Sequence, residues 1–72
     1  MKKIIQYLDG TPHPFTIENF KSDLTIFCAG FSFQVINRGA INVYWKAFEG
    51  SQCVGTFDRE KDLLEFVTQR IK

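Results

Sequence analysis

The feature that most constrains the fold of this chain is a strand meander that runs straight into a helix. It covers residues 31–57, with the sequence FSFQVINRGAINVYWKAFEGSQCVGTF, and continues into DREKDLLEFVTQRI. Apolar and polar side chains alternate over 31–36 and 40–48, which is the period-two pattern of strands with one buried face. Residues 52–57 form a third strand segment. We therefore expect three strands, joined by two tight turns.

The turn residues between these segments support that assignment. Asn37-Arg38-Gly39 is typical of a type I turn closed by a glycine in the left-handed region, and Glu49-Gly50-Ser51 suits a second hairpin. After the third strand, Asp58 is placed to cap a helix, with Glu60 near the positive end of the helix dipole. The apolar face of this helix comprises Leu63, Leu64, Phe66, Val67 and Ile71.

The first part of the chain is less regular. Residues 3–8 are apolar enough to predict a first strand, and the loop DGTPHP follows. Apolar residues then recur at helical spacing between Ile17 and Phe31, with Thr16 as a candidate N-cap and Gly30 placed for a C-terminal cap. This pattern favours one helix over 16–28. The alternative is a short helix followed by a long strand with a bulge at Gly30, because residues 24–27 have strand propensity.

These assignments predict a single α+β domain over residues 1–72. We expect an antiparallel sheet of three or four strands with two helices packed on one face, in the order β-α-β-β-β-α. A chain this short buries only about 60% of the surface that its unfolded form exposes. It nevertheless carries eight Phe, two Tyr and one Trp. Because so small a core encloses few rings, we expect some of them on a surface for a partner or for a second copy, as in a homodimer.

The composition excludes several classes of protein. The formal net charge is +1, and basic residues are spread along the chain, which argues against a strongly basic nucleic-acid-binding face. The opening MKKIIQYLDG has too short an apolar run for a signal peptide, and no segment reaches membrane-spanning length. Cys28, Cys53 and His13 lack the paired spacing of a zinc site. We expect a cytoplasmic protein with reduced thiols and no membrane association.

No catalytic constellation is evident in the sequence. The only histidine, His13, lies between two prolines and far along the chain from both cysteines. There is no glycine-rich phosphate loop and no paired metal-ligand motif. Asp58, Glu60 and Asp62 lie at a helix start, where capping and dipole effects already account for them. We therefore expect no enzyme activity, no metal and no cofactor.

Binding is then the expected activity, and the sheet indicates where. If Phe33, Val35, Val43 and Trp45 face the helices, the opposite face carries a set of polar and aromatic residues suited to recognition. The candidate binding residues on it are Gln34, Asn42, Tyr44, Lys46 and Phe48. The edge of the sheet, open to strand addition by a partner or a second copy, is an alternative surface, as are the helices.

Two resemblances bear on function. The order helix–strand–strand–strand–helix expected for residues 16–71 resembles the double-stranded-RNA-binding domain, which implies nucleic-acid binding. That family has a lysine-rich cluster at the start of its last helix, whereas here Arg59 and Lys61 alternate with acidic residues in DREKDLLEF.

The opening MKKIIQYL, the short strands and VGTFDREKDLLEFV are similar to small phage-encoded inhibitors, including anti-CRISPR proteins. This resemblance implies stoichiometric blocking of a host protein or ribonucleoprotein complex, without chemistry. The leading hypothesis is accordingly a non-enzymatic protein-binding module, and the alternative is a nucleic-acid-binding domain.

Overall fold

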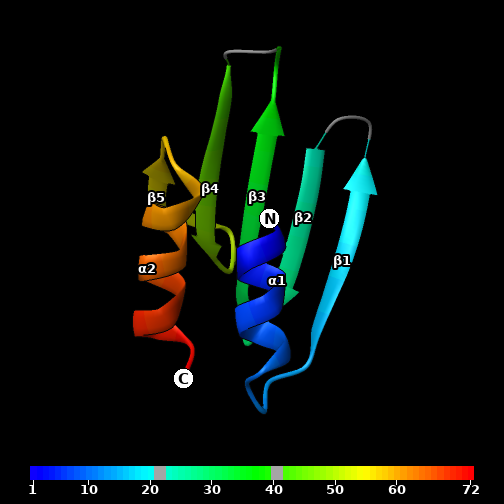
Figure 1. Cartoon of the computed structure of the whole chain (residues 1–72), viewed down its shortest axis with the longest axis vertical. Coiled ribbons are helices and arrows are strands. Elements are labelled where there is room, and N and C mark those ends of the chain that lie inside the picture. The colour runs from blue at the N-terminus through cyan, green and yellow to red at the C-terminus, as the bar shows by residue number, and fades with distance from the viewer. Residues whose placement is uncertain (21–22, 40–41) are drawn as a thin grey trace.

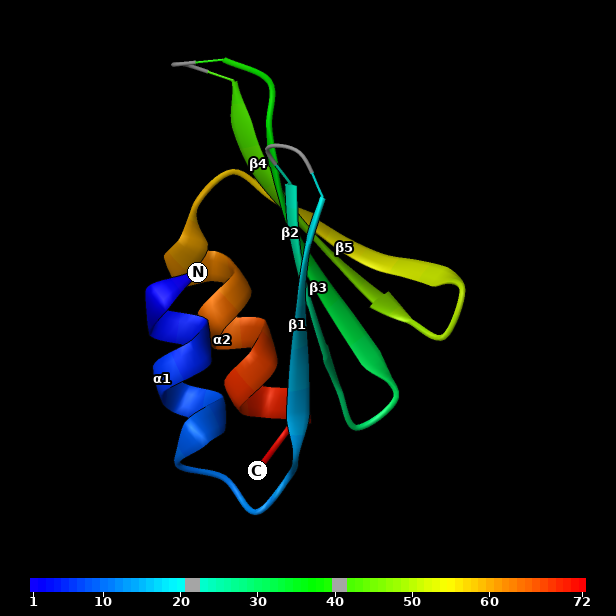
Figure 2. The same cartoon turned by 90° about the vertical axis from the view of Figure 1, so that its right-hand side faces the viewer.

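The protein is a five-stranded antiparallel sheet with two helices on one of its faces (Figures 1 and 2). A computed structural model describes residues 1–20, 23–39 and 42–72 of the chain. Consecutive strands are neighbours throughout, so the sheet is a meander in the order β1-β2-β3-β4-β5. The elements are α1 (Lys2–Asp9), β1 (Phe15–Phe20), β2 (Asp23–Cys28), β3 (Phe31–Asn37), β4 (Val43–Glu49), β5 (Gln52–Phe57) and α2 (Glu60–Arg70).

The α+β class, the antiparallel sheet and the second half of the element order are confirmed. Strands β3 and β5 and helix α2 lie where the alternation and the amphipathic pattern predicted them. The strand predicted for 40–48 is β4, which begins at Val43; residues 40 and 41 lie outside the described part of the chain. The N-cap of α2 is Arg59 rather than Asp58, and it makes no side-chain capping bond.

The strand predicted for residues 3–8 is wrong, because this segment is helix α1. A six-residue apolar run fits a strand or a buried helical turn equally well by periodicity. Ile4 and Leu8 are one helical turn apart and both fully buried, whereas Gln6, which would share their face in a strand, is exposed. The segment is helical because those two side chains then pack together against α2 and the sheet.

The helix predicted for residues 16–28 is also wrong. The segment forms strands β1 and β2, so the sheet has five strands rather than three or four, and the order is α-β-β-β-β-β-α rather than β-α-β-β-β-α. The alternative, a short helix and then a long strand with a bulge at Gly30, is wrong as well, because β1 takes the place of the helix and Gly30 lies in the turn between β2 and β3. Leu24, Ile26 and Cys28 share one face of β2, and this period-two set coincided with a helical spacing over a short window.

A two-residue turn, Ala29-Gly30, joins β2 to β3. Both residues have positive φ, 52° at Ala29 and 83° at Gly30, as in the type I′ turns that suit the twist of hairpins. The turn places Cys28 opposite Phe31 and so fixes the register of β2 on β3. Gly30 therefore serves a hairpin and not a helix cap.

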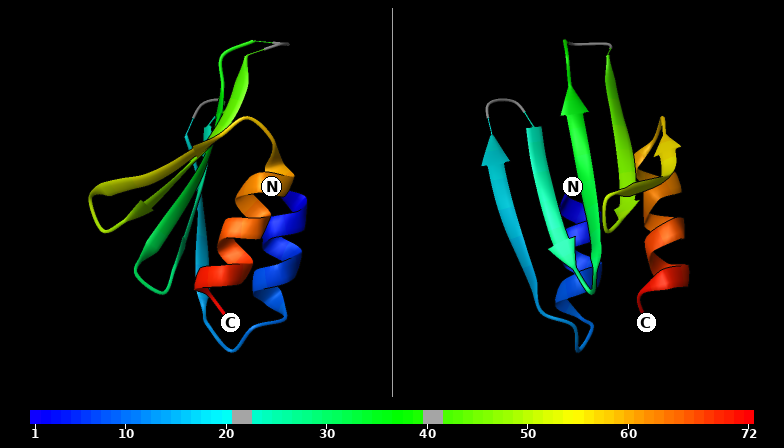
Figure 3. Two further views of the ribbon diagram at one scale, coloured as in Figure 1. Left: turned by 90° about the vertical axis from the view of Figure 1, so that its left-hand side faces the viewer. Right: turned by 180° about the vertical axis from the view of Figure 1, so that it is seen from behind.

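The core lies between the helices and the face of the sheet that they cover, here called the inner face (Figure 3). Ile26, Phe33 and Ala47 are paired neighbours on β2, β3 and β4, and each is fully buried. The helices complete the core with fully or almost fully buried residues: Ile4 and Leu8 on α1, Leu63 and Val67 on α2, and Ile71 just beyond it.

The two helices run in the same direction, side by side, and are tied together at both ends (Figure 2). At their N-terminal ends, the Glu60 carboxylate lies 3.3 Å from the Met1 ammonium group and accepts a hydrogen bond from the Lys3 backbone N–H at 3.1 Å. At the other end, the Tyr7 hydroxyl donates to the carbonyl oxygen of Ile71. The Glu60 carboxylate thus lies at the N-terminal ends of both helices, where it interacts favourably with the positive ends of their dipoles.

Replacing that carboxylate tests the helix arrangement. We expect Glu60→Ala to lower the free energy of unfolding by about 1 kcal/mol, the usual cost of losing a helix cap, and the melting temperature by roughly 4–8 °C. Glu65→Ala on the exposed side of α2 is the matched control, since it removes a carboxylate from the same helix. Equal losses in the two variants, measured by thermal unfolding, would show that Glu60 does not tie the helices.

Candidate protein-binding face

The face of the sheet opposite the helices is here called the outer face; both helices in the described part of the chain lie on the other side (Figures 2 and 3). Paired residues form rows across the strands on this face. One row, here called the aromatic row, holds Thr16, Phe27, Ser32, Phe48 and Cys53. The next, the polar row, holds Glu18, Thr25, Gln34, Lys46 and Thr56.

Four of the five predicted binding residues come together on this face. Gln34 is paired with Lys46, and Phe48 with Ser32, on neighbouring strands β3 and β4. Tyr44 lies two residues from Lys46 on the same face, and the Lys46 ammonium nitrogen is 5.8 Å from the centre of the Tyr44 ring. A cation at this distance from an aromatic face is weakly attracted to it, which holds the two side chains next to each other.

The fifth predicted residue, Asn42, lies in the loop before β4. Its carbonyl oxygen accepts a hydrogen bond from the Arg38 backbone N–H at 2.9 Å, and its own N–H donates to the Gly39 carbonyl at 3.2 Å. These backbone bonds give Asn42 a role in closing the loop. Its alternation with Tyr44 in the sequence suggested a place on the strand that it does not occupy.

An ion pair borders the outer face near the same loop. The Arg38 guanidinium bonds both oxygens of Asp23, at 2.7 Å and 3.2 Å. The hydrogen bond from Arg38 is the main reason that the pKa of Asp23 lies below its ordinary value, and Asp23 raises the pKa of Arg38 in turn. Both charges are therefore partnered, whereas Lys46 makes no ion pair with any residue that the structure describes.

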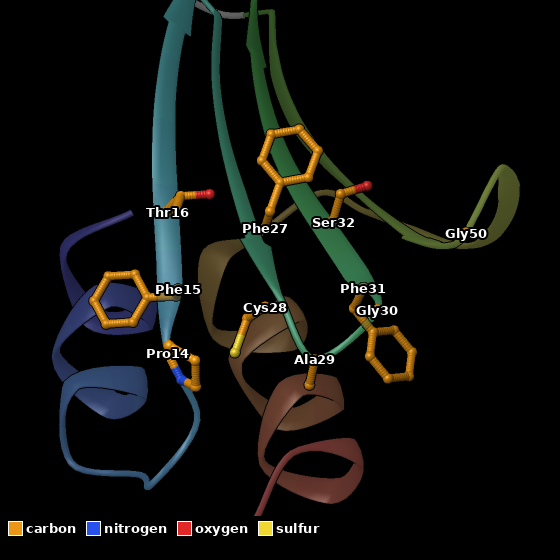
Figure 4. Close-up of a pocket in the computed structure, with 10 residues that line it drawn as sticks. All are labelled: Pro14, Phe15, Thr16, Phe27, Cys28, Ala29, Gly30, Phe31, Ser32 and Gly50. Carbon is orange, nitrogen blue, oxygen red and sulfur yellow. The ribbon is translucent and has the colours of Figure 1, made fainter.

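Sequence reasoning missed Phe27 and the pocket beside it. Phe27 is 42% exposed, a high value for so large an apolar side chain. Next to it is an open pocket of about 420 Å³ at the β2–β3 turn (Figure 4). Its lining is mostly apolar and comprises Pro14, Phe15, Thr16, Phe27, Cys28, Ala29, Gly30, Phe31, Ser32 and Gly50.

The pocket is continuous with the aromatic row, because Thr16, Phe27 and Ser32 belong to both. The signal for Phe27 was present in the sequence as the alternation of Leu24, Ile26 and Cys28 with Thr25 and Phe27. The helix predicted for residues 16–28 obscured this alternation.

The titratable groups near the pocket are poorly suited to nucleophilic chemistry. Burial raises the pKa of the Cys28 thiol, which disfavours the reactive thiolate. The His13 Nε2 atom lies 3.1 Å from the Lys72 carbonyl oxygen, so its ring is engaged there and not with a thiol. Among the described residues, no three His, Cys, Asp or Glu side chains are grouped so as to hold a metal ion. The pocket is best suited to an apolar group.

Comparisons with protein-family models, with curated proteins and with solved structures gave no match. Within residues 1–20, 23–39 and 42–72, no helix has the length and apolar character needed to cross a bilayer.

The two thiols should differ sharply in reactivity. Cys53 is exposed and Cys28 is 3% exposed, and neither is in a disulfide. We expect an aromatic disulfide reagent to modify Cys53 quickly and Cys28 at least about a hundredfold more slowly, at a rate set by opening of the fold. A Cys53→Ser variant should lose the fast phase. Similar rates for both thiols would contradict the burial of Cys28.

Proposed function

We propose that the protein is a non-enzymatic binding module that holds a protein partner against its outer face. The observation that carries the proposal is the continuous surface formed by the aromatic row, the pocket and the Tyr44–Lys46 pair on a face that no helix covers. In contrast, the inner face carries both described helices, and its central row of Ile26, Phe33 and Ala47 is fully buried in the core.

The chemistry of this surface is that of a protein interface. Binding energy at such interfaces is concentrated in a few residues, often Trp, Tyr and Arg, in well-packed pockets surrounded by contacts that exclude water. Phe27 and Phe48 flank Ser32 across three strands, and the pocket adjoins Phe27. An apolar side chain of the partner would enter the pocket, while a carboxylate or carbonyl oxygen would meet Lys46.

The partner that we propose is a host protein or ribonucleoprotein complex, blocked by stoichiometric binding. Support comes from the similarity of MKKIIQYL and VGTFDREKDLLEFV to small phage-encoded inhibitors of the anti-CRISPR kind. The competing nucleic-acid hypothesis has lost its topological basis, because it required a helix at 16–28 where the structure has β1 and β2.

The test is affinity capture with variants of the outer face. Tyr44→Ala with Lys46→Ala should reduce the recovery of a specific partner from the native host lysate about tenfold or more, because truncating a residue that dominates an interface, often a tyrosine, costs about 2 kcal/mol or more. Thermal unfolding should change little, since both side chains are partly exposed and outside the core.

The matched control is Glu65→Ala with Gln69→Ala on the exposed side of α2. It should recover the partner as the unaltered protein does, and recovery should persist after nuclease treatment. Unchanged recovery by the Tyr44 and Lys46 variant would exclude the outer face, and loss on nuclease treatment would assign the binding to nucleic acid.

A further inference from the structure

Strand β1 forms an edge of the sheet, and among the described elements it pairs with β2 alone (Figure 1). Figure 2 views this edge directly and shows both helices set to one side of it. Natural proteins usually block such edges with proline, lysine or a bulge. The sequence of β1, FTIENF, has none of these residues and carries a single charge, at Glu18.

The register shows which backbone groups of β1 face away from the sheet. Cys28 and Phe31 flank a two-residue turn, so they form a hydrogen-bonded pair, and Ile26 and Leu24 likewise bond toward β3. The other residues of β2, namely Phe27, Thr25 and Asp23, form their backbone hydrogen bonds toward β1. Their partners there are Thr16, Glu18 and Phe20, in that order. The N–H and C=O groups of Phe15, Ile17 and Asn19 therefore point outward from the edge.

The side chains at this edge are suited to a second copy of the same strand. Ile17 is 40% exposed although it continues the inner-face row of Ile26, Phe33 and Ala47. An antiparallel pairing centred on Ile17 would place the two Ile17 side chains together and use all the outward backbone groups from Phe15 to Asn19. It also places Thr16 opposite Glu18 of the second copy.

Other registers are less favourable. A pairing centred on Glu18 would set two like charges directly opposite each other, which is destabilising. A pairing centred on Phe15, Thr16 or Asn19 would leave some of the outward-pointing backbone groups of β1 without a partner. The register centred on Ile17 thus pairs all the outward backbone groups, places apolar side chains at the axis and keeps the two Glu18 side chains apart.

We propose that β1 pairs with β1 of a second copy about a twofold axis through Ile17, so that the two five-stranded sheets join into one. Antiparallel pairing keeps the side chains of opposed residues on the same side, so both outer faces lie on one side of the joined sheet. The dimer then presents two copies of the outer face to a partner. The dimer and the binding role of the outer face are independent and can fail separately.

The test is sedimentation equilibrium under reducing conditions, which exclude disulfide dimers through Cys53. The unaltered protein should dimerise with a dissociation constant in about the micromolar range, as expected of a small interface. Ile17→Lys, which brings two ammonium groups together at the axis, should raise that constant about tenfold or more.

A second variant tests the register itself. Thr16→Lys places an ammonium group opposite Glu18 of the other copy, twice in each dimer, and should lower the dissociation constant by about two- to fivefold. Thr56→Lys, an exposed position on the other edge strand, is the matched control and should leave dimerisation unchanged. Thermal unfolding of each variant shows that it remains folded.

Three outcomes would overturn the proposal. The first is an unaltered protein that stays monomeric up to about 1 mM, far above the expected constant. The second is a dimer that Ile17→Lys leaves intact. The third is weakening by Thr16→Lys, which would contradict the register. If the Tyr44 and Lys46 variant abolishes the dimer instead, the outer face is the interface between copies.

Discussion

The structure depends on the packing of two parallel helices against one face of a meander sheet. Ile4 and Leu8 on α1 and Leu63 and Val67 on α2 are fully buried against the row of Ile26, Phe33 and Ala47. Parallel helices bring their positive dipole ends together, which is unfavourable unless an anion lies between them. Glu60 supplies that anion through its contacts with Met1 and Lys3. Because both helices lie on the same side, no described element packs over the other side of the sheet.

This one-sided arrangement is the basis of the proposed binding surface. Both helices among the described residues lie on the inner face, so neither encloses the aromatic side chains of the outer face. Phe27, Phe48 and Tyr44 consequently lie partly exposed on the outer face, close to Lys46 and to an open apolar pocket. Among the described elements, β1 pairs only with β2, so its other edge has no strand beside it. In the dimer that we propose, pairing of β1 with a second copy extends the sheet without a new core.

The part of the fold that the sequence predicted is the part where long alternation leaves one interpretation. β3, β4 and α2 each carry a pattern of six or more residues that fits a single period, and the turn residues Glu49-Gly50-Ser51 set β5 apart as a third strand. Residues 3–8 and 16–28 carry patterns that fit both periods, and tertiary packing decided between them. Ile4 and Leu8 needed a helix to reach α2, and Ala29 adopts a left-handed conformation that nothing in its side chain indicates. The candidate binding residues that lie on β3 and β4 were predicted from the sequence. Phe27 was missed because the sequence pattern predicted a helix where strand β2 lies.

The central claim is that one face of the sheet is core and the other is open to a partner. The most direct measurement is the attenuation of side-chain NMR signals by a soluble gadolinium chelate, which acts only on groups near the solvent. The account predicts strong attenuation for the rings of Phe27, Phe48 and Tyr44 and little for Phe33, Ile26 and Val67. Equal attenuation of Phe27 and Phe33, or protection of Phe27 in the monomer, would contradict it.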